Sequence, residues 1–226
     1  MPKLSKIRLV YLAVLYVTAF CAFPAAALQA PTQIQLAKVY EQDKTTPVSD
    51  YLVSEKYDGI RAIWTGKQLL TRQSNPISAP EWFTAPLPEV WLDGELWTKR
   101  QNFEDLSSIV RTQIPEEERW REVQYMVFDM PDAQLPFENR YKNYSNLIEQ
   151  IGAEHIKAVK QQRFHSNHEL SKHLQAMVEK GAEGLMLHLA TAPHQSGRSD
   201  ALLKLKPYFD DEAEVIAHLP GKGKYT

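Results

Sequence analysis

Apolar runs of strand length recur along the sequence from residue 51 to residue 207. They are YLVSEKY, IRAIWTG, KQLLTR, EVWLDGELW, VQYMVFDM, GLMLHL and ALLKLKP. Short runs of this kind indicate strands. Two longer segments have helical spacing instead: Pro136–Ile151, which is followed by Gly152, and Asn167–Lys180, which is followed by Gly181. Many strands with a few helices between them predict an α+β fold.

The first 27 residues have the pattern of a secretory signal peptide. A basic start is followed by an apolar stretch, Leu9–Phe23, and by three alanines that end at Ala27. The stretch is short for a membrane span and ends at Pro24, so an N-terminal anchor is the less favoured alternative. We expect cleavage near Leu28 and export to the periplasm, with no membrane attachment of the mature chain.

Composition excludes several kinds of chemistry. The single cysteine, Cys21, lies in the predicted signal peptide, so the mature chain would have no disulfide, no thiolate nucleophile and no cysteine-ligated zinc. His165, His168 and His173 do not have the spacing of a good helical ligand pair. Three of the 26 basic residues and none of the 28 acidic ones lie in the signal peptide, so the mature chain is acidic. Any nucleic acid must therefore contact a local basic patch.

A lysine lies between two of the apolar runs, in the string Lys56-Tyr57-Asp58-Gly59. Asp-Gly between apolar residues is a strong signal for a β-hairpin, and on that interpretation Lys56 is a solvated side chain beside the turn. A lysine amine is also a nucleophile toward phosphorus when its site favours the uncharged form. The string alone does not decide between the two interpretations.

Three other runs contain residues that also have both a structural and a functional interpretation. In WLDGELW, Glu95 taken alone is a solvent-facing strand residue more often than a ligand. In VQYMVFDM, Met126, Phe128 and Met130 share one face by the period of two, and a core aromatic is the simplest interpretation of Phe128. In EGLMLHL, Glu183 directly follows a predicted helix end, which places a carboxylate at the mouth of a buried strand.

The run LLKLKP carries two ammonium groups on one face of a strand. Leu203 and Leu205 point one way, while Lys204 and Lys206 point the other. Solvated lysines at a sheet edge are one explanation. Because like charges so placed repel each other, a polyanionic ligand would turn this unfavourable pair into a binding site.

Together these segments resemble the nucleotidyltransferase superfamily of ATP-dependent DNA ligases, RNA ligases and mRNA capping enzymes. The matching motifs are, in order, KYDGIR, LDGELW, YMVFDM, EGLML and LLKLKP, and the match extends from Glu55 to Pro207. The sequences of these motifs are most similar to those of DNA ligases. The signal peptide and the short length resemble the minimal bacterial DNA ligases. The resemblance implies the nucleotidyltransferase (ATP-grasp-like) fold over residues 28–207, with antiparallel sheets and flanking helices.

The resemblance also implies an activity: ATP-dependent sealing of nicks in duplex DNA, with roles in DNA repair, replication or recombination. Lys56 would attack the α-phosphate of ATP, carry AMP through a phosphoamide bond, and pass it to the 5′-phosphate of a nick. The residues expected to bind the nucleotide are Ser54, Glu55, Arg61, Arg72, Glu95, Phe128, Lys204 and Lys206. Glu95 and Glu183 are the expected ligands of Mg²⁺, with Mn²⁺ as an alternative metal. We expect a monomer whose partners are ATP and nicked double-stranded DNA.

Two positions depart from the family pattern. His188 stands where a basic residue is common, and Arg72 lacks its usual neighbours. In the family, a small β-barrel, the OB-fold domain, follows the paired lysines. Residues 208–226 resemble only its beginning, so we expect a truncated OB-fold domain, slow self-adenylation and poor affinity for duplex DNA.

Three alternatives remain open at this point. An RNA ligase or a capping enzyme would share the lysine chemistry, although export argues against capping. A NAD-dependent ligase would need a nicotinamide-binding domain before Lys56, and only about 28 residues separate the expected cleavage site from this lysine. A non-sealing, nucleotide-binding remnant is the alternative from a different class, although every principal catalytic group is present.

Overall fold

The computed structural model describes residues 34–42 and 46–207. The predicted signal peptide, residues 1–27, and the predicted start of an OB-fold, residues 208–226, lie outside the described residues. Within the described residues, no helix has the length and apolar character needed to cross a membrane.

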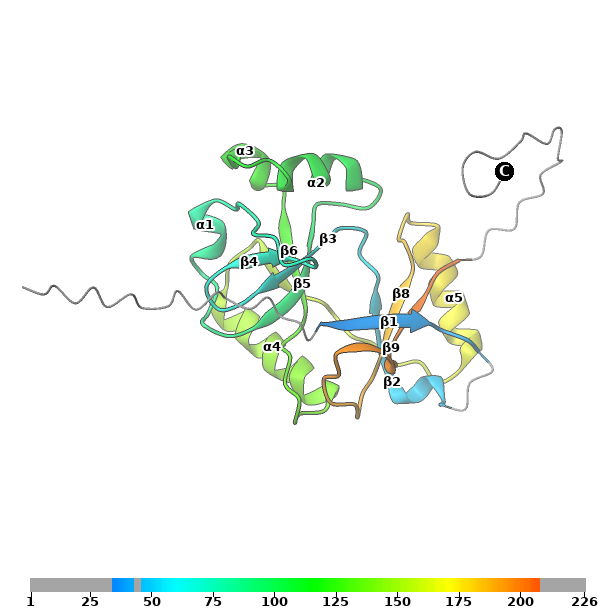
Figure 1. Cartoon of the computed structure of the whole chain (residues 1–226). Helices are drawn as coiled ribbons and strands as arrows, with labels where there is room; N and C mark the ends of the chain where they lie inside the picture. Colours follow the sequence, from blue (N-terminus) through cyan, green and yellow to red (C-terminus); the bar gives the residue numbers. More distant parts are fainter. Residues whose placement is uncertain (1–33, 43–45, 208–226) are drawn as a thin grey trace, which may run out of the picture.

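The strands form two sheets that lie side by side (Figure 1). Sheet A has the order β1-β9-β8-β2 and sheet B the order β4-β3-β5-β6-β7. Sheet A consists of β1 (Gln35–Val39), β2 (Tyr51–Glu55), β8 (Leu185–Leu189) and β9 (Gly197–Leu205). Sheet B consists of β3 (Ile60–Trp64), β4 (Leu69–Thr71), β5 (Leu92–Trp97), β6 (Gln124–Asp129) and β7 (Ile156–Ala158). Pairing is antiparallel except for β1 with β9 and β6 with β7, so the predicted α+β class is confirmed.

Both predicted helices are present. Helix α4 (Phe137–Ile151) ends at Gly152, which has the left-handed conformation (φ 64°) that a helix C-terminus favours in glycine. Helix α5 (Asn167–Val178) begins after Ser166, whose hydroxyl accepts a hydrogen bond from the Glu169 amide at 3.2 Å. The shorter helices were not predicted. They are α1 (Glu81–Thr84), α2 (Phe103–Val110), α3 (Glu117–Trp120) and a 3-10 turn at Val48–Asp50.

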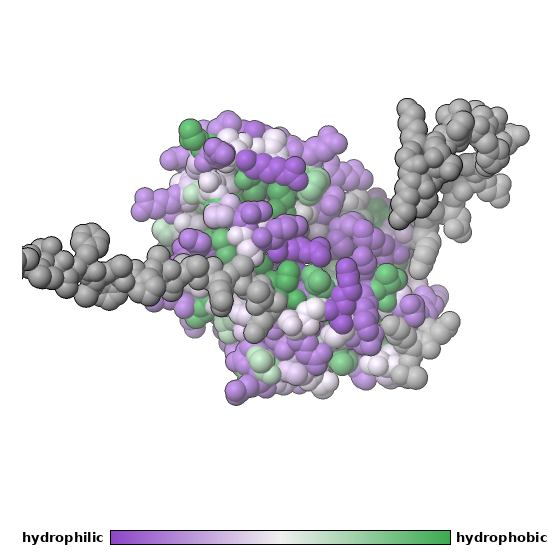
Figure 2. Space-filling view, in the orientation of Figure 1, coloured by the Kyte–Doolittle hydropathy of each residue, from purple (hydrophilic) through white to green (hydrophobic). Residues whose placement is uncertain are grey.

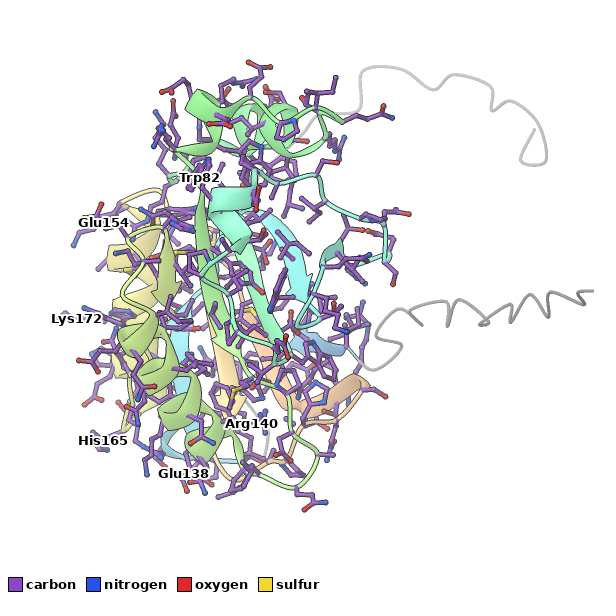
Figure 3. All side chains as sticks on the ribbon, turned by 90° about the vertical axis from the view of Figure 1, so that its left-hand side faces the viewer. Trp82, Glu138, Arg140, Glu154, His165 and Lys172 are labelled. Carbon is purple, nitrogen blue, oxygen red and sulfur yellow. The ribbon has the colours of Figure 1, made fainter. Side chains whose placement is uncertain are left out.

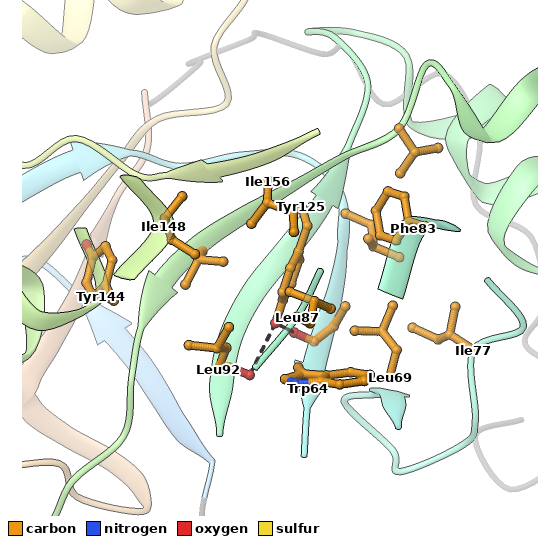
Figure 4. Packing of buried hydrophobic residues seen from close by; sticks show 14 of the residues in the cluster. Trp64, Leu69, Ile77, Phe83, Leu87, Leu92, Tyr125, Tyr144, Ile148 and Ile156 are labelled. Carbon is orange, nitrogen blue, oxygen red and sulfur yellow. Dashed lines mark hydrogen bonds between the residues drawn. The ribbon is translucent and has the colours of Figure 1, made fainter. Parts of the chain in front are cut away.

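Each sheet has its own hydrophobic core. In sheet B, Tyr125 is fully buried and its hydroxyl lies 3.1 Å and 3.2 Å from the carbonyls of Ala62 and Leu92, among the side chains in Figure 4. Helix α4 covers this sheet with Tyr144 and Ile148. The smaller core of sheet A is closed by α5. The face of the molecule shown in Figure 2 is mainly hydrophilic, with apolar residues gathered near its middle.

The segment Lys56–Gly59 crosses from one sheet to the other. Strand β2 pairs with β8 in sheet A, and β3 pairs with β4 and β5 in sheet B, so β2 and β3 form no hairpin. The hairpin interpretation of Asp58-Gly59 is therefore wrong. A Cβ atom on Gly59 would lie 2.2 Å from the carbonyl oxygen of Leu96, which explains why glycine occupies this crossover. The crossover places Lys56 at the junction of the sheets.

Candidate active site

A cavity of about 330 Å³ lies where the two sheets meet. Its walls come from strands β1, β2, β8 and β9 of sheet A and from β3, β5 and β6 of sheet B. Among the lining residues are Ser54, Glu55, Lys56, Arg61, Arg72, Glu95, Phe128, Lys204 and Lys206. The structure thus brings together the predicted nucleophile and every residue that was predicted to bind the nucleotide.

Glu183, the remaining predicted residue, does not line the cavity itself but contacts two lysines that do. Its carboxylate accepts hydrogen bonds from the ammonium groups of Lys56 and Lys206, and the Lys206 bond is 2.5 Å long. Partial burial acts to raise the pKa of Glu183, but the hydrogen bonds from Lys206 and Lys56 outweigh it and leave the pKa below its ordinary value. Glu183 is therefore an anion that holds both lysines in place.

Backbone pairing fixes this arrangement. The amide of Lys56 donates to the carbonyl of Gly184 at 2.9 Å, and Met186 on β8 pairs with Lys204 on β9. A Cβ atom on Gly184, whose φ is 152°, would lie 2.3 Å from the carbonyl oxygen of Leu205. The predicted alternation along β9 is present, because Leu203 and Leu205 are buried and Lys204 faces the cavity.

Arg61 and Glu95 lie opposite each other on neighbouring strands of sheet B. Arg61 is held by both carboxylate oxygens of Asp93, one of them at 2.9 Å, and also donates to the carbonyl of Gln35 at 2.8 Å. Its guanidinium carbon lies 5.5 Å from the centre of the Phe128 ring. Phe128 is partly exposed at the cavity and does not belong to the core, so the core interpretation of this residue is wrong.

Burial raises the pKa of Glu95 to about 8, and the positive charges of Lys56 and Arg61 compensate only in part. A carboxylate in these surroundings is stabilised by an additional cation. Among the described residues, no three His, Cys, Asp or Glu side chains gather as in an all-protein metal site. Mg²⁺ does not require one, because it binds one or two carboxylates together with substrate phosphates. Glu95 fits such a role, whereas Glu183 would first have to release its lysines.

The side chain of Glu55 has a different partner from the one predicted. Both of its carboxylate oxygens accept hydrogen bonds from Arg100, at 2.8 Å and 2.9 Å. Sequence reasoning missed Arg100, which follows β5 and lies 45 residues away. Because Arg100 occupies this carboxylate, the part of Glu55 that remains free to meet a ligand is its backbone.

Sequence reasoning also missed a buried ion pair behind the cavity. Arg140 on α4 is fully buried and binds both oxygens of Asp129 at 2.8 Å and 3.0 Å; Figure 3 labels Arg140. Its guanidinium also lies 3.4 Å from Nε2 of His188, whose ring stacks on Phe137. Burial first, and then the charge of Arg140, lower the pKa of His188 well below its ordinary value. Arg140 thus places a positive charge beside His188, the position at which the sequence departs from the basic residue expected by resemblance.

Comparison with known proteins agrees with this geometry. A family model described as the ATP dependent DNA ligase domain matches residues 34–206. The chain belongs to the ATP-dependent DNA ligase family. A DNA ligase of Haemophilus influenzae is 33% identical to it over 211 residues, which are 93% of this chain and 76% of that protein.

Two solved structures resemble this ligase in both sequence and fold. One comes from a study of DNA binding with a minimal scaffold by Lig E DNA ligases; it is 44% identical, has a TM-score of 0.79, and the match covers 85% of this chain and 75% of that one. The other is the Chlorella virus DNA ligase-adenylate, with 26% identity, a TM-score of 0.63, and coverage of 78% and 68%. The predicted resemblance and fold are therefore confirmed.

Proposed function

We propose that this ligase seals nicks in duplex DNA through an AMP group carried on Lys56. One observation carries the proposal: Lys56 lies in the wall of a cavity that Lys204 and Lys206 also line, and the Glu183 carboxylate binds both Lys56 and Lys206. A nucleophile beside a cationic cradle has the arrangement needed to attack a phosphate ester. The family membership supports the same reaction.

In the first step, Nζ of Lys56 attacks the α-phosphorus of ATP as an uncharged amine. A P–N bond forms, the P–O bond to the β-phosphate breaks, pyrophosphate leaves, and Nζ loses a proton. Lys204 on β9 and Lys206 directly after this strand both line the cavity, where their charges would stabilise the phosphoryl oxygens. Bound Mg²⁺ would be held by Glu95, and by Glu183 once this carboxylate has released its lysines, and would supply further charge neutralisation.

The rest of the nucleotide fits the remaining walls. Phe128 offers a ring face to adenine, and Met186 also lines the cavity. Glu95 would accept hydrogen bonds from the ribose hydroxyls, and Arg61 and Arg72 would bind phosphate oxygens. Ser54 and the backbone of Glu55 lie next to the nucleophile along β2, where they would contact the base.

In the second and third steps, a DNA 5′-phosphate oxygen attacks the phosphorus of the lysyl-AMP group and displaces Lys56. The adjacent 3′-hydroxyl then attacks the activated 5′-phosphate, forms the phosphodiester bond and releases AMP. An RNA ligase would use the same first step, and a nucleotide-binding remnant would stop after it. Sealing of a nicked DNA duplex therefore separates this proposal from both alternatives.

Labelled ATP with Mg²⁺ provides the test. After denaturation, the wild-type chain is expected to retain covalent label and Lys56→Ala is expected to have none. Lys67→Ala is the matched control, because Lys67 is an exposed lysine outside the cavity. Equal labelling of wild type and Lys56→Ala would refute the assignment of Lys56. A wild-type enzyme that carries AMP on Lys56 but never seals a nick would refute the ligase activity.

A further inference from the structure

The two residues that flank Lys56 are held by one short segment of sheet B. Glu55 precedes Lys56, and Tyr57 follows it. The ring of Tyr57 meets the ring of Trp97 edge to face, with the ring centres 5.1 Å apart, and both carboxylate oxygens of Glu55 accept hydrogen bonds from Arg100. Trp97 is the last residue of β5, and Arg100 follows shortly after it. Contacts with the end of β5 thus lie on both sides of Lys56.

The pair of Glu55 and Arg100 links the two sheets. Glu55 is the last residue of β2 in sheet A, whereas Arg100 follows β5 of sheet B. In Figure 1, sheet B lies to the left, and sheet A with α5 lies to the right. The side chains of Arg100 and Glu55 are 30% and 13% exposed. Because a guanidinium that binds a carboxylate through two parallel hydrogen bonds fixes the direction of its partner as well as the distance, this pair restricts movement of β2 against β5.

Arg100 also reaches the segment that leads to Glu183. Its guanidinium donates a hydrogen bond to the carbonyl of Lys180 at 3.2 Å. The next residue, Gln101, has a φ of 57°, and an added Cβ atom on Gly181 would lie 3.1 Å from the side-chain nitrogen of Gln101. A left-handed glutamine is uncommon and persists only where its surroundings hold it in place. The turn after β5 is therefore packed against the turn after α5, directly before Glu183.

The proposed reaction requires a fixed distance between Lys56 and strand β5. Glu95 on β5 would hold the ribose, so this strand sets the place of the α-phosphate, while the crossover sets the place of the Lys56 amine. A displacement of about 1 Å from the productive geometry can slow a reaction about a hundredfold. The crossover lies close to β5, because an added Cβ atom on Gly59 would be 2.8 Å from Cγ of Glu95. A contact that holds the crossover on β5 therefore affects the rate.

We propose that Arg100 is a positioning residue for Lys56. Through Glu55 and the carbonyl of Lys180, it fixes the crossover against β5 and so sets the rate at which Lys56 receives AMP. Arg100 does not line the nucleotide cavity, so this assignment gives it no contact with ATP. Its loss should lower the maximal rate and leave the affinity for ATP unchanged. The inference rests on the proposed function, because it concerns the formation of lysyl-AMP.

Single-turnover labelling over a range of ATP concentrations, with Mg²⁺, tests the proposal. For Arg100→Gln, the rate constant at saturating ATP is expected to fall about tenfold to a hundredfold, while the ATP concentration that gives half of this rate stays within about twofold of wild type. The final extent of labelling should equal that of the wild type. A role in stability alone would reduce the extent and leave the rate constant unchanged, and this result would overturn the inference.

Arg121→Ala is the matched control and should label as the wild type does. Arg121 is an exposed arginine that pairs with Glu118 at 3.4 Å and does not line the cavity.

Replacement of the partner separates positioning from direct contact with ATP. Glu55→Gln breaks the same pair from the other side, so it should slow labelling about as much as Arg100→Gln does, and the double variant should be no slower than the single variants. If Arg100 contacted ATP itself, Arg100→Gln would raise the ATP concentration required, and Glu55→Gln would keep the rate of the wild type. That pattern would overturn the inference.

Hydrogen exchange at the Lys56 amide measures the position of the crossover without any turnover. This amide donates to the carbonyl of Gly184. It should exchange about fivefold faster in Arg100→Gln than in wild type and in Arg121→Ala. Equal exchange in all three proteins, or an unchanged rate constant for labelling, would overturn the inference while the proposed function stands. A wild type that forms no lysyl-AMP would instead refute the proposed function, and the role given to Arg100 would fail with it.

Discussion

Replacement of Glu95 by glutamine is expected to stabilise the protein and to impair its activity. Burial raises the pKa of this carboxyl from its ordinary value of 4.5 to about 8. Between these two values the unfolded chain has already lost the proton that the folded chain keeps, so unfolding releases a proton. The free energy of unfolding therefore falls as the pH rises from about 4.5 to about 8.

The size of the effect follows from the two pKa values of Glu95, 4.5 and about 8. The ionised carboxylate destabilises the folded state by at most about 1 kcal/mol at pH 5 and about 4 kcal/mol at pH 8. Glutamine has the same shape and no charge, so Glu95→Gln removes this term at every pH. The difference in stability between the variant and the wild type should therefore widen by about 3 kcal/mol between pH 5 and pH 8.

Urea unfolding of both proteins at pH 5, 6, 7 and 8, without nucleotide or divalent metal, measures this difference. Glu89→Gln, which changes an exposed glutamate, is the control and should follow the wild type at each pH. The formation of lysyl-AMP by Glu95→Gln should fall by about tenfold to a thousandfold, because the ribose and metal contacts that we propose for Glu95 would be lost. A difference in stability that does not change with pH, or a wild type that is the more stable protein at pH 8, would refute the reasoning.

Two further predictions concern the cavity wall and the ion pair behind it. Lys204→Ala and Lys206→Ala should each slow formation of lysyl-AMP by about tenfold to a thousandfold. The double variant should lose less than the product of both factors, since we propose that both lysines act on one phosphate. Single-turnover labelling measures these rates, and unchanged rates would mean that the lysines are solvated edge residues. Arg140→Met should lower the free energy of unfolding by about 3–5 kcal/mol, because it leaves Asp129 charged and unpaired in the interior; urea unfolding measures this, and a loss below about 1 kcal/mol would contradict a buried ion pair.

Much of the local structure was predictable because its causes are local. The alternation of Leu203, Lys204 and Leu205 at the end of β9 follows from the period of two of a strand. The end of α4 follows from the conformational freedom of Gly152. Neither feature depends on residues far away in the chain, so the sequence pattern was sufficient for both.

Other local patterns gave the wrong answer because tertiary structure overrode them. The Asp-Gly pair after Lys56 has the sequence of a hairpin turn, yet the chain crosses there from one sheet to the other. Strand β2 finds its partner in β8, more than a hundred residues later, and this pairing buries Val53 and Leu187 in the core of sheet A. Burial of a whole strand outweighs the preference of a two-residue turn.

The sequence by itself determined which residue types the site contains and where most of its strands run. Only the tertiary structure decided which of these residues meet. Lys56 and Glu183 are 127 residues apart and share a hydrogen bond, and Arg140 reaches His188 from another element of the fold. Such contacts depend on the register of the strands and on the packing of α4 against sheet B, which the whole chain sets together. No local sequence pattern encodes them, because the free energy that fixes them comes from burying surfaces that are distant in the sequence.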